Sequence, residues 1–110
     1  MTMQEFTIEN LPNQTFRVAK ISPVDLMAIT TMIDFDKFET NKSLITFCLE
    51  NTEVKMGNTW QPVKVKGREN YQPMGIENDF ISLNQIFVWM MENVIAKTFT
   101  KSSESTETTL

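Results

Sequence analysis

Near the N-terminus, apolar and polar side chains alternate with the two-residue period of a β-strand. β-Branched and aromatic residues follow this alternation over residues 4–9 and 15–21, and the segment Leu11–Gln14 between them has the proline and asparagine of a turn. We therefore predict an N-terminal β-hairpin. Its apolar side chains share one face that needs a cover: Phe6 and Ile8 from the first strand, Phe16 and Val18 from the second.

A helical period follows the hairpin. Segment 22–25 (Ser-Pro-Val-Asp) offers a hydroxyl for the N-cap, a proline where no amide hydrogen is needed, and a carboxylate near the positive end of the helix dipole. Apolar residues then recur at helical spacing, which predicts a helix from Pro23 to about Ile33 that covers the hairpin. A second helix is expected from about Lys42 to Asn51, opened by Thr40 or Asn41.

The middle of the chain carries a second hairpin pattern. Residues 53–56 and 59–66 read as strands, and Gly57-Asn58 between them supplies the positive φ that a two-residue hairpin loop requires. Pro62 favours an edge strand or a break in the second strand, because proline has no amide hydrogen for a ladder bond. Residues 67–75 are polar and are expected to form a connecting loop.

The last apolar stretch predicts a long C-terminal helix over Leu83–Phe99. Ser82 and Gln85 have the spacing of a capping box. The helix is apolar over more than half of its circumference, so its excess apolar surface must be buried either in the centre of the domain or against another chain. Two stripes result: Leu83, Ile86, Phe87, Met90 and Val94 in one, and Val88, Met91, Ile95 and Phe99 in the other.

These patterns predict an α+β domain with an N-terminal hairpin, about three helices, a second short hairpin in the middle and a long C-terminal helix. One globular domain is expected over residues 1–99. Residues 100–110 are small, hydroxylated or acidic, and they cannot bury enough apolar surface to offset the backbone entropy lost on ordering. We therefore expect a disordered tail or linker there.

Composition narrows the chemistry. The 110 residues include no histidine, so catalysis and metal binding that need imidazole are excluded. The single cysteine, Cys48, has no activating partner and is expected to be a small buried hydrophobe. Net charge is −4, which argues against nucleic acid as a partner, and the basic stretch Lys55–Arg68 is interpreted as a solvated face. Asp34 and Asp36 are interpreted as loop and cap residues, so we expect no metal, no cofactor and no enzymatic activity.

No membrane span or secretory signal is visible. No stretch approaches the roughly 20 apolar residues that cross a bilayer. Residues 1–10 have neither the cationic start nor the apolar core of a signal peptide. These observations lead us to expect a cytoplasmic protein with no membrane partner.

The order of elements resembles that of a known family. A short β segment is followed by Phe16–Leu26, then by Ile45–Val54 and Trp60–Val63, and finally by Phe80–Phe99 with a Ser/Thr/Glu tail. This arrangement is similar to the tail assembly chaperones of long-tailed, siphovirus-type bacteriophages or prophages of Gram-positive hosts. The resemblance covers most of residues 4–105 and is one of pattern, without an invariant motif.

The resemblance implies a protein that binds without catalysis. Such chaperones coat the tape measure protein, keep it soluble, help to deliver tail tube protein and are generally absent from the virion, and they act in the cytoplasm of the infected or lysogenic host. A homo-oligomer is also expected. The family has no shared site motif, so the predicted partner surface comes from the second stripe of the last helix and its neighbour. Its residues are Val88, Trp89, Met91, Ile95 and Phe99, with Met90 also expected to lie partly outward.

Three other classes of protein compete with this interpretation. The first is a structural tail or head-completion protein that stays in the virion. The second is an acidic mimic of nucleic acid, which needs clustered carboxylates, whereas the acids here are scattered among lysines. The third is an enzyme that uses Asp34, Asp36 or Glu77, for which the chain offers no constellation of partners.

Overall fold

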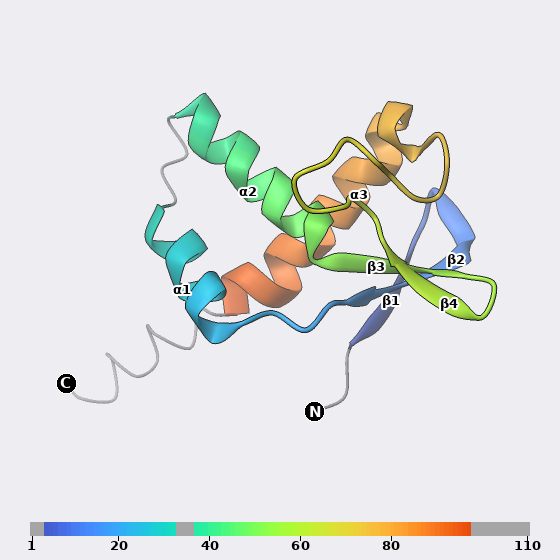
Figure 1. The fold of residues 1–110 in the computed structure, drawn as a ribbon, viewed down its shortest axis with the longest axis horizontal. Helices are drawn as coiled ribbons and strands as arrows, with labels where there is room; N and C mark the ends of the chain where they lie inside the picture. The colour runs from blue at the N-terminus through green and yellow to red at the C-terminus, as the bar shows by residue number, and fades with distance from the viewer. Residues whose placement is uncertain (1–3, 33–36, 98–110) are drawn as a thin grey trace.

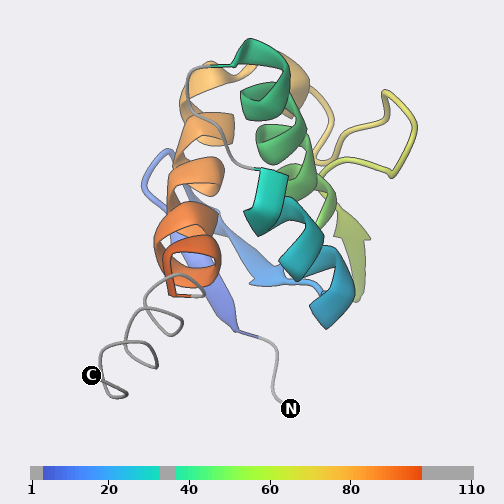
Figure 2. The ribbon, with the colours of Figure 1, turned by 90° about the vertical axis from the view of Figure 1, so that its left-hand side faces the viewer.

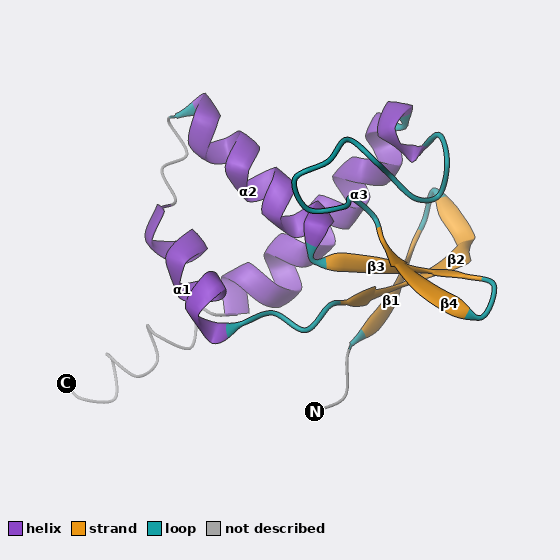
Figure 3. Ribbon diagram, viewed as in Figure 1, coloured by secondary structure: helices purple, strands orange, loops and turns teal. Residues whose placement is uncertain are grey.

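The fold combines one antiparallel sheet with three α-helices. The computed structural model describes residues 4–32 and 37–97, and within them the sheet has the strand order β1-β2-β3-β4 (Figure 1). The strands are β1 (Glu5–Ile8), β2 (Leu11–Val18), β3 (Thr52–Met56) and β4 (Thr59–Pro62). The helices are α1 (Pro23–Met32), α2 (Phe38–Glu50) and α3 (Phe80–Met90), with a 3₁₀ turn at Ile76–Asn78 and a π-helical segment at Met91–Ile95 (Figure 3). The predicted α+β class is confirmed, and residues 98–110, which include the predicted tail, lie outside the described residues.

The two hairpins share one sheet. Strand β2 pairs with β3 in antiparallel register, with Phe16 opposite Val54. Gly57 has the positive φ, 65°, that the predicted hairpin loop needs, and β4 ends at Pro62 as the missing amide hydrogen suggested. The predicted strand end at residue 66 is therefore wrong by four residues.

The first turn lies earlier than predicted. The chain reverses at Glu9-Asn10, and the predicted turn residues Leu11–Gln14 belong to β2, with an irregular register between Phe6 and Ile8 on the partner strand. The physical reason is tertiary. The Asn10 backbone N–H donates to Gln85 Oε1 at 2.8 Å, so the start of α3 holds the turn in place.

One face of the sheet carries the core. Figure 2 shows α2 and α3 side by side over this face, where the Trp89 ring of α3 stacks on the Phe6 ring with centroids 3.8 Å apart. Trp89 therefore supplies the cover for β1, and the prediction that the helix beginning at Pro23 would cover the hairpin is wrong. The buried apolar residues are Phe6, Ile8, Phe16, Ile29, Leu44, Cys48, Leu49, Val54, Val63, Ile76, Ile86, Met90 and Ile95.

The first two helices differ in how well their ends were predicted. Helix α1 begins after Ser22, whose hydroxyl accepts from the Val24 backbone N–H at 3.2 Å, as the sequence indicated. Helix α2 begins at Phe38, several residues before the predicted start, and Lys37 precedes it without a side-chain cap. Because no side chain caps this helix start, no local pattern marks it in the sequence.

Candidate interaction surface

The buried side of the last helix has an unequal spacing that decides which residues can reach a partner. Its fully buried positions are Ser82, Ile86, Met90 and Ile95, separated by four, four and five residues. The five-residue step crosses the π-helical segment Met91–Ile95, where one extra residue enters the turn. Inside this segment the Asn93 side-chain amide donates to the Trp89 backbone oxygen at 3.0 Å.

The π-turn overturns part of the predicted partner surface. A regular α-helix would place Val94, four residues after Met90, on the buried side. Instead Ile95 occupies that side with 0% of its surface exposed, and Met90 is equally enclosed. The prediction that Ile95 and Met90 lie partly outward is therefore wrong. Met90 continues the four-residue spacing of the buried side, and the extra residue in the π-turn rotates Ile95 against the core.

The remaining residues of the predicted partner surface differ in how exposed they are. Val88 faces outward and is 40% exposed. Trp89 and Met91 are half-buried and packed against the core, and Trp89 is engaged by Phe6. Phe99 lies outside the described residues. The C-terminal half of this helix is thus mainly a core element, and of the predicted residues that the structure describes, Val88 alone is classed as exposed.

The N-terminus of α3 is fixed by a polar network. Asp79, and not the predicted Ser82, is the N-cap: its carboxylate accepts from the Ser82 backbone N–H at 3.1 Å and from the Ser82 hydroxyl at 2.7 Å. These hydrogen bonds stabilise the charged carboxylate and lower the pKa of Asp79. The Asn10 side-chain amide donates to Ser82 Oγ at 2.7 Å and to the Asp79 carboxylate, which joins the β1–β2 turn to the helix start.

Exposed apolar side chains gather around this capped helix start. Met74, Phe80 and Ile81 are 90%, 78% and 57% exposed, and we call these three residues the apolar pole. Consecutive turns fold the chain between them, because the amides of Ile76, Asn78 and Asp79 each donate three residues back along the chain. Beside the pole is an open hollow of about 230 Å³, lined by Leu11, Pro73, Met74, Gly75, Ile76 and Asp79.

Sequence reasoning missed the apolar pole for an identifiable reason. With the cap predicted at Ser82, Phe80 and Ile81 fall outside the predicted helix, and the pattern makes no prediction about their exposure. A signal for the correct start was present in Asp79. Aspartate is one of the preferred N-cap residues, and its carboxylate can accept from the backbone amide three residues later.

A second apolar area lies on α1. Val24 and Met27 are three positions apart, which puts them on one side of the helix, and both are exposed. The helix buries Ile29 on its other side. Exposed apolar side chains therefore occur on two separate elements, α1 and the start of α3.

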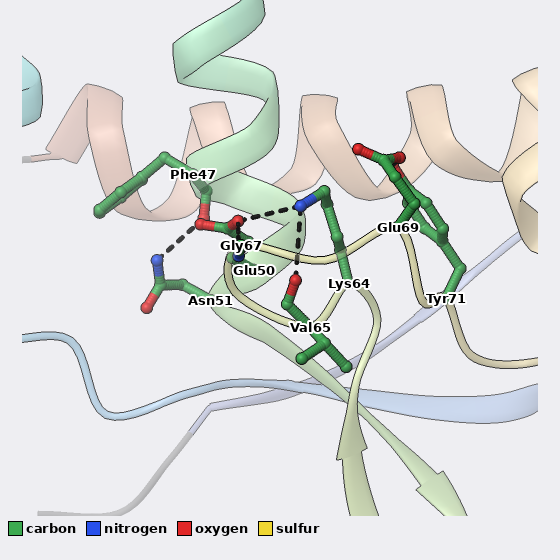
Figure 4. Close-up of polar contacts among 8 residues, drawn as sticks. All are labelled: Phe47, Glu50, Asn51, Lys64, Val65, Gly67, Glu69 and Tyr71. Atoms are coloured by element: carbon green, nitrogen blue, oxygen red, sulfur yellow. Dashed lines mark hydrogen bonds and ion pairs between the residues drawn. The ribbon is translucent and has the colours of Figure 1, made fainter.

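The basic stretch is not one solvated face. Lys64 is buried, with its Nζ 3.1 Å from Glu50 Oε2, and the Gly67 backbone N–H donates to the same carboxylate oxygen (Figure 4). Lys55, Lys66 and Arg68 are exposed. The interpretation of this stretch as a uniform solvated face is therefore wrong for Lys64, which holds the 63–72 loop against the end of α2.

The open face of the sheet is polar at its centre. The Arg17 guanidinium Nε lies 2.6 Å from Glu53 Oε1, and the same group stacks 4.2 Å from the centroid of the Trp60 ring. Trp60 is thus engaged by a paired arginine and not by the neighbouring lysines. The guanidinium charge of Arg17 is compensated by Glu53, while the group covers the Trp60 ring.

The described residues offer little catalytic chemistry. Burial raises the pKa of the Cys48 thiol to about 12, so the thiolate that a nucleophile needs does not form near neutral pH. Partial burial and the carboxylate of Glu69 raise the pKa of Tyr71. Asp34 and Asp36 lie outside the described residues, and Glu77 is exposed. Across 4–32 and 37–97 there is no group of three His, Cys, Asp or Glu side chains placed to hold a metal ion.

Two further observations complete the description. In the described part of the chain, no helix has the length and apolar character needed to cross a bilayer. Comparison with protein-family models, with curated proteins and with solved structures finds no match.

Proposed function

We propose that this protein is a phage tail assembly chaperone that binds and solubilises the tape measure protein and assists assembly of the tail tube. It acts by binding, without catalysis, in the cytoplasm of the infected or lysogenic bacterium. The observation that carries the proposal is the apolar pole, three large apolar side chains that are exposed around the start of α3 on a small acidic domain. The family resemblance of the sequence supplies the identity of the client.

The energetics suit a binding role. Burying a large apolar side chain contributes about 1.5–3 kcal/mol, so Met74, Phe80 and Ile81 together offer several kcal/mol before the cost of association is subtracted. Val24 and Met27 on α1 present a second apolar area. Two areas on one molecule let several copies cover a long client by multivalent contact.

Co-expression with a phage tape measure protein tests the proposal. The wild-type protein keeps that client soluble and is recovered with it by affinity capture. Phe80→Asp combined with Ile81→Asp abolishes both results, because two charges replace the apolar contact, while circular dichroism shows the fold retained. Asn84→Asp in the same helix is the control, since Asn84 is already exposed and polar. A client that is equally soluble with and without the protein refutes the proposal.

Mass spectrometry of purified particles distinguishes a chaperone from a structural component. A chaperone is absent from finished virions, whereas a tail or head-completion protein is present in stoichiometric amounts. Detection of this chain in the particle therefore replaces the chaperone proposal with the structural one.

A further inference from the structure

The segments that build the apolar pole carry charges of one sign. All ten Lys and Arg residues of the chain lie outside segments 4–16 and 69–91, which build the β1–β2 turn, the hollow and the start of α3. The same segments contain five acids: Glu5, Glu9, Glu69, Glu77 and Asp79.

Two of these carboxylates are available to a partner. Glu9, in the β1–β2 turn, and Glu77, in the 3₁₀ turn before α3, are both exposed. Neither makes a hydrogen bond or an ion pair with any other described residue. Asp79 is different, because its carboxylate oxygens already accept hydrogen bonds from Asn10 and Ser82. The pole is therefore an apolar centre with a negative rim whose charge is not compensated locally.

From this arrangement we infer that the apolar pole docks a helical segment whose apolar side is flanked by lysines or arginines. The inference rests on the proposed function, in which the client supplies that segment. Apolar side chains of the segment cover Phe80, Ile81 and the hollow, and its cationic flanks meet Glu9 and Glu77. Complementary charge at the rim mainly raises the association rate and selects the partner, while the apolar centre supplies most of the affinity.

A helical occupant is favoured over an extended one by its backbone. The pole presents side chains, and its own amides at the start of α3 are engaged by Asp79 and by the preceding turns. An extended peptide laid on this surface would leave backbone polar groups facing apolar atoms. A helix satisfies these groups internally and offers one continuous apolar side.

Other occupants carry the wrong charge. A second copy docked pole to pole would set Glu9 and Glu77 of both molecules around one apolar contact, where like charges repel. Nucleic acid and an anionic bilayer are repelled by the same rim. A cationic partner alone pairs with the rim.

The binding assay uses two synthetic peptides of roughly 18 residues, each a single-sided helix with leucines at i, i+3, i+4 and i+7. One carries lysines at the remaining positions and its twin carries glutamates, and each is labelled for fluorescence anisotropy. We expect the lysine peptide to bind at least about tenfold more tightly than its twin, a difference of about 1.4 kcal/mol. Equal affinity for the two peptides overturns the inference.

Matched variants locate the contact. Phe80→Ala with Ile81→Ala weakens binding of the lysine peptide by about tenfold or more, the loss expected when a central apolar contact is truncated. Ile45→Ala removes an exposed apolar side chain from α2 and changes the affinity by less than about twofold. An equal loss in both variants, or no loss in the first, places the contact elsewhere and overturns the inference.

The rim is tested with two variants that change the net charge by the same amount. Glu9→Gln with Glu77→Gln weakens binding by about threefold or more at low ionic strength and reduces its salt dependence. Asp25→Asn with Glu92→Gln changes the net charge by the same amount on exposed positions of α1 and the π-helical segment, and leaves the affinity nearly unchanged. Equal losses show attraction to overall charge only. Self-association that disappears with the Phe80 variant identifies a second copy as the occupant. Either result overturns the inference.

Failure of this inference is distinguishable from failure of the proposed function. If the lysine peptide binds at the pole but the co-expressed client is not rescued, the docking inference stands and the chaperone proposal falls. If the wild-type protein rescues and captures the client but binds the lysine peptide no more tightly than its glutamate twin, the docking inference falls and the chaperone proposal stands.

Discussion

Truncating Ile95 and Val94 in turn tests the π-turn that controls which side of the last helix is buried. Ile95 has 0% of its surface exposed, and Val94 is half-buried. Replacing a fully buried isoleucine by alanine costs about 2–5 kcal/mol, from lost transfer energy and the cavity left behind. Val94→Ala removes less buried surface, about 1 kcal/mol or less at roughly 0.8 kcal/mol per fully buried methylene. Both changes gain similar helix propensity, so propensity does not explain a difference between them.

Urea unfolding followed by circular dichroism and tryptophan fluorescence measures both losses. A loss of about 3 kcal/mol in Ile95→Ala is a large share of the 5–15 kcal/mol typical of a domain, and lowers Tm by roughly 12–24 °C. Glu92→Ala, an exposed position in the same segment, is the control and leaves stability nearly unchanged. If Val94→Ala costs more than Ile95→Ala, the helix continues in regular α form and our account of its buried side is refuted.

Three further predictions address the cap, the buried ion pair and the thiol. Asp79→Asn lowers Tm at neutral pH by weakening the helix cap. Because the pKa of Asp79 is lowered on folding, the difference in Tm between the two proteins persists above about pH 4 and shrinks as the pH falls below it. A Tm difference that stays constant with pH in thermal melts contradicts a role of the Asp79 charge in the cap. Lys64→Ala leaves the Glu50 carboxylate largely enclosed without its cation and lowers the free energy of unfolding, measured by chemical denaturation, by about 3 kcal/mol. Lys64→Met with Glu50→Leu recovers most of that loss. If the double variant recovers none of it, the ion pair is not the cause. The Cys48 thiol stays unreactive toward a disulfide reagent at pH 8 until denaturant unfolds the chain, and rapid reaction of the native protein contradicts its burial.

Elements that are stabilised by their own residues could be predicted from the sequence. The start of α1 was predictable because the Ser22 hydroxyl binds an amide two residues ahead, and the β3–β4 turn was predictable because Gly57 can adopt a positive φ. The burial of Phe6 and Phe16 followed from their alternation along two strands. In each case the stabilising contact or conformation lies within a few residues of the signal.

Elements held by distant residues could not be predicted in this way. The β1–β2 turn lies at Glu9-Asn10 because Asn10 is bound by side chains of α3 about seventy residues later in the chain. Lys64 lies within a stretch interpreted as solvated, yet it is buried because Glu50 from α2 compensates its charge. These positions depend on pairings that no local pattern encodes.

The last helix shows most clearly the difference between what the sequence pattern predicts and what depends on tertiary packing. Residue spacing is enough to predict that the segment is helical and apolar over more than half of its circumference. How that surface is used depends on the fold: α3 packs on the sheet beside α2, a π-turn brings Ile95 inward, and the most exposed apolar residues of the helix are Phe80 and Ile81 at its start. The physical reason is that a side chain is buried only when a second surface packs against it. The local spacing of residues identifies the apolar surface of the helix, and the fold determines which distant residues cover it.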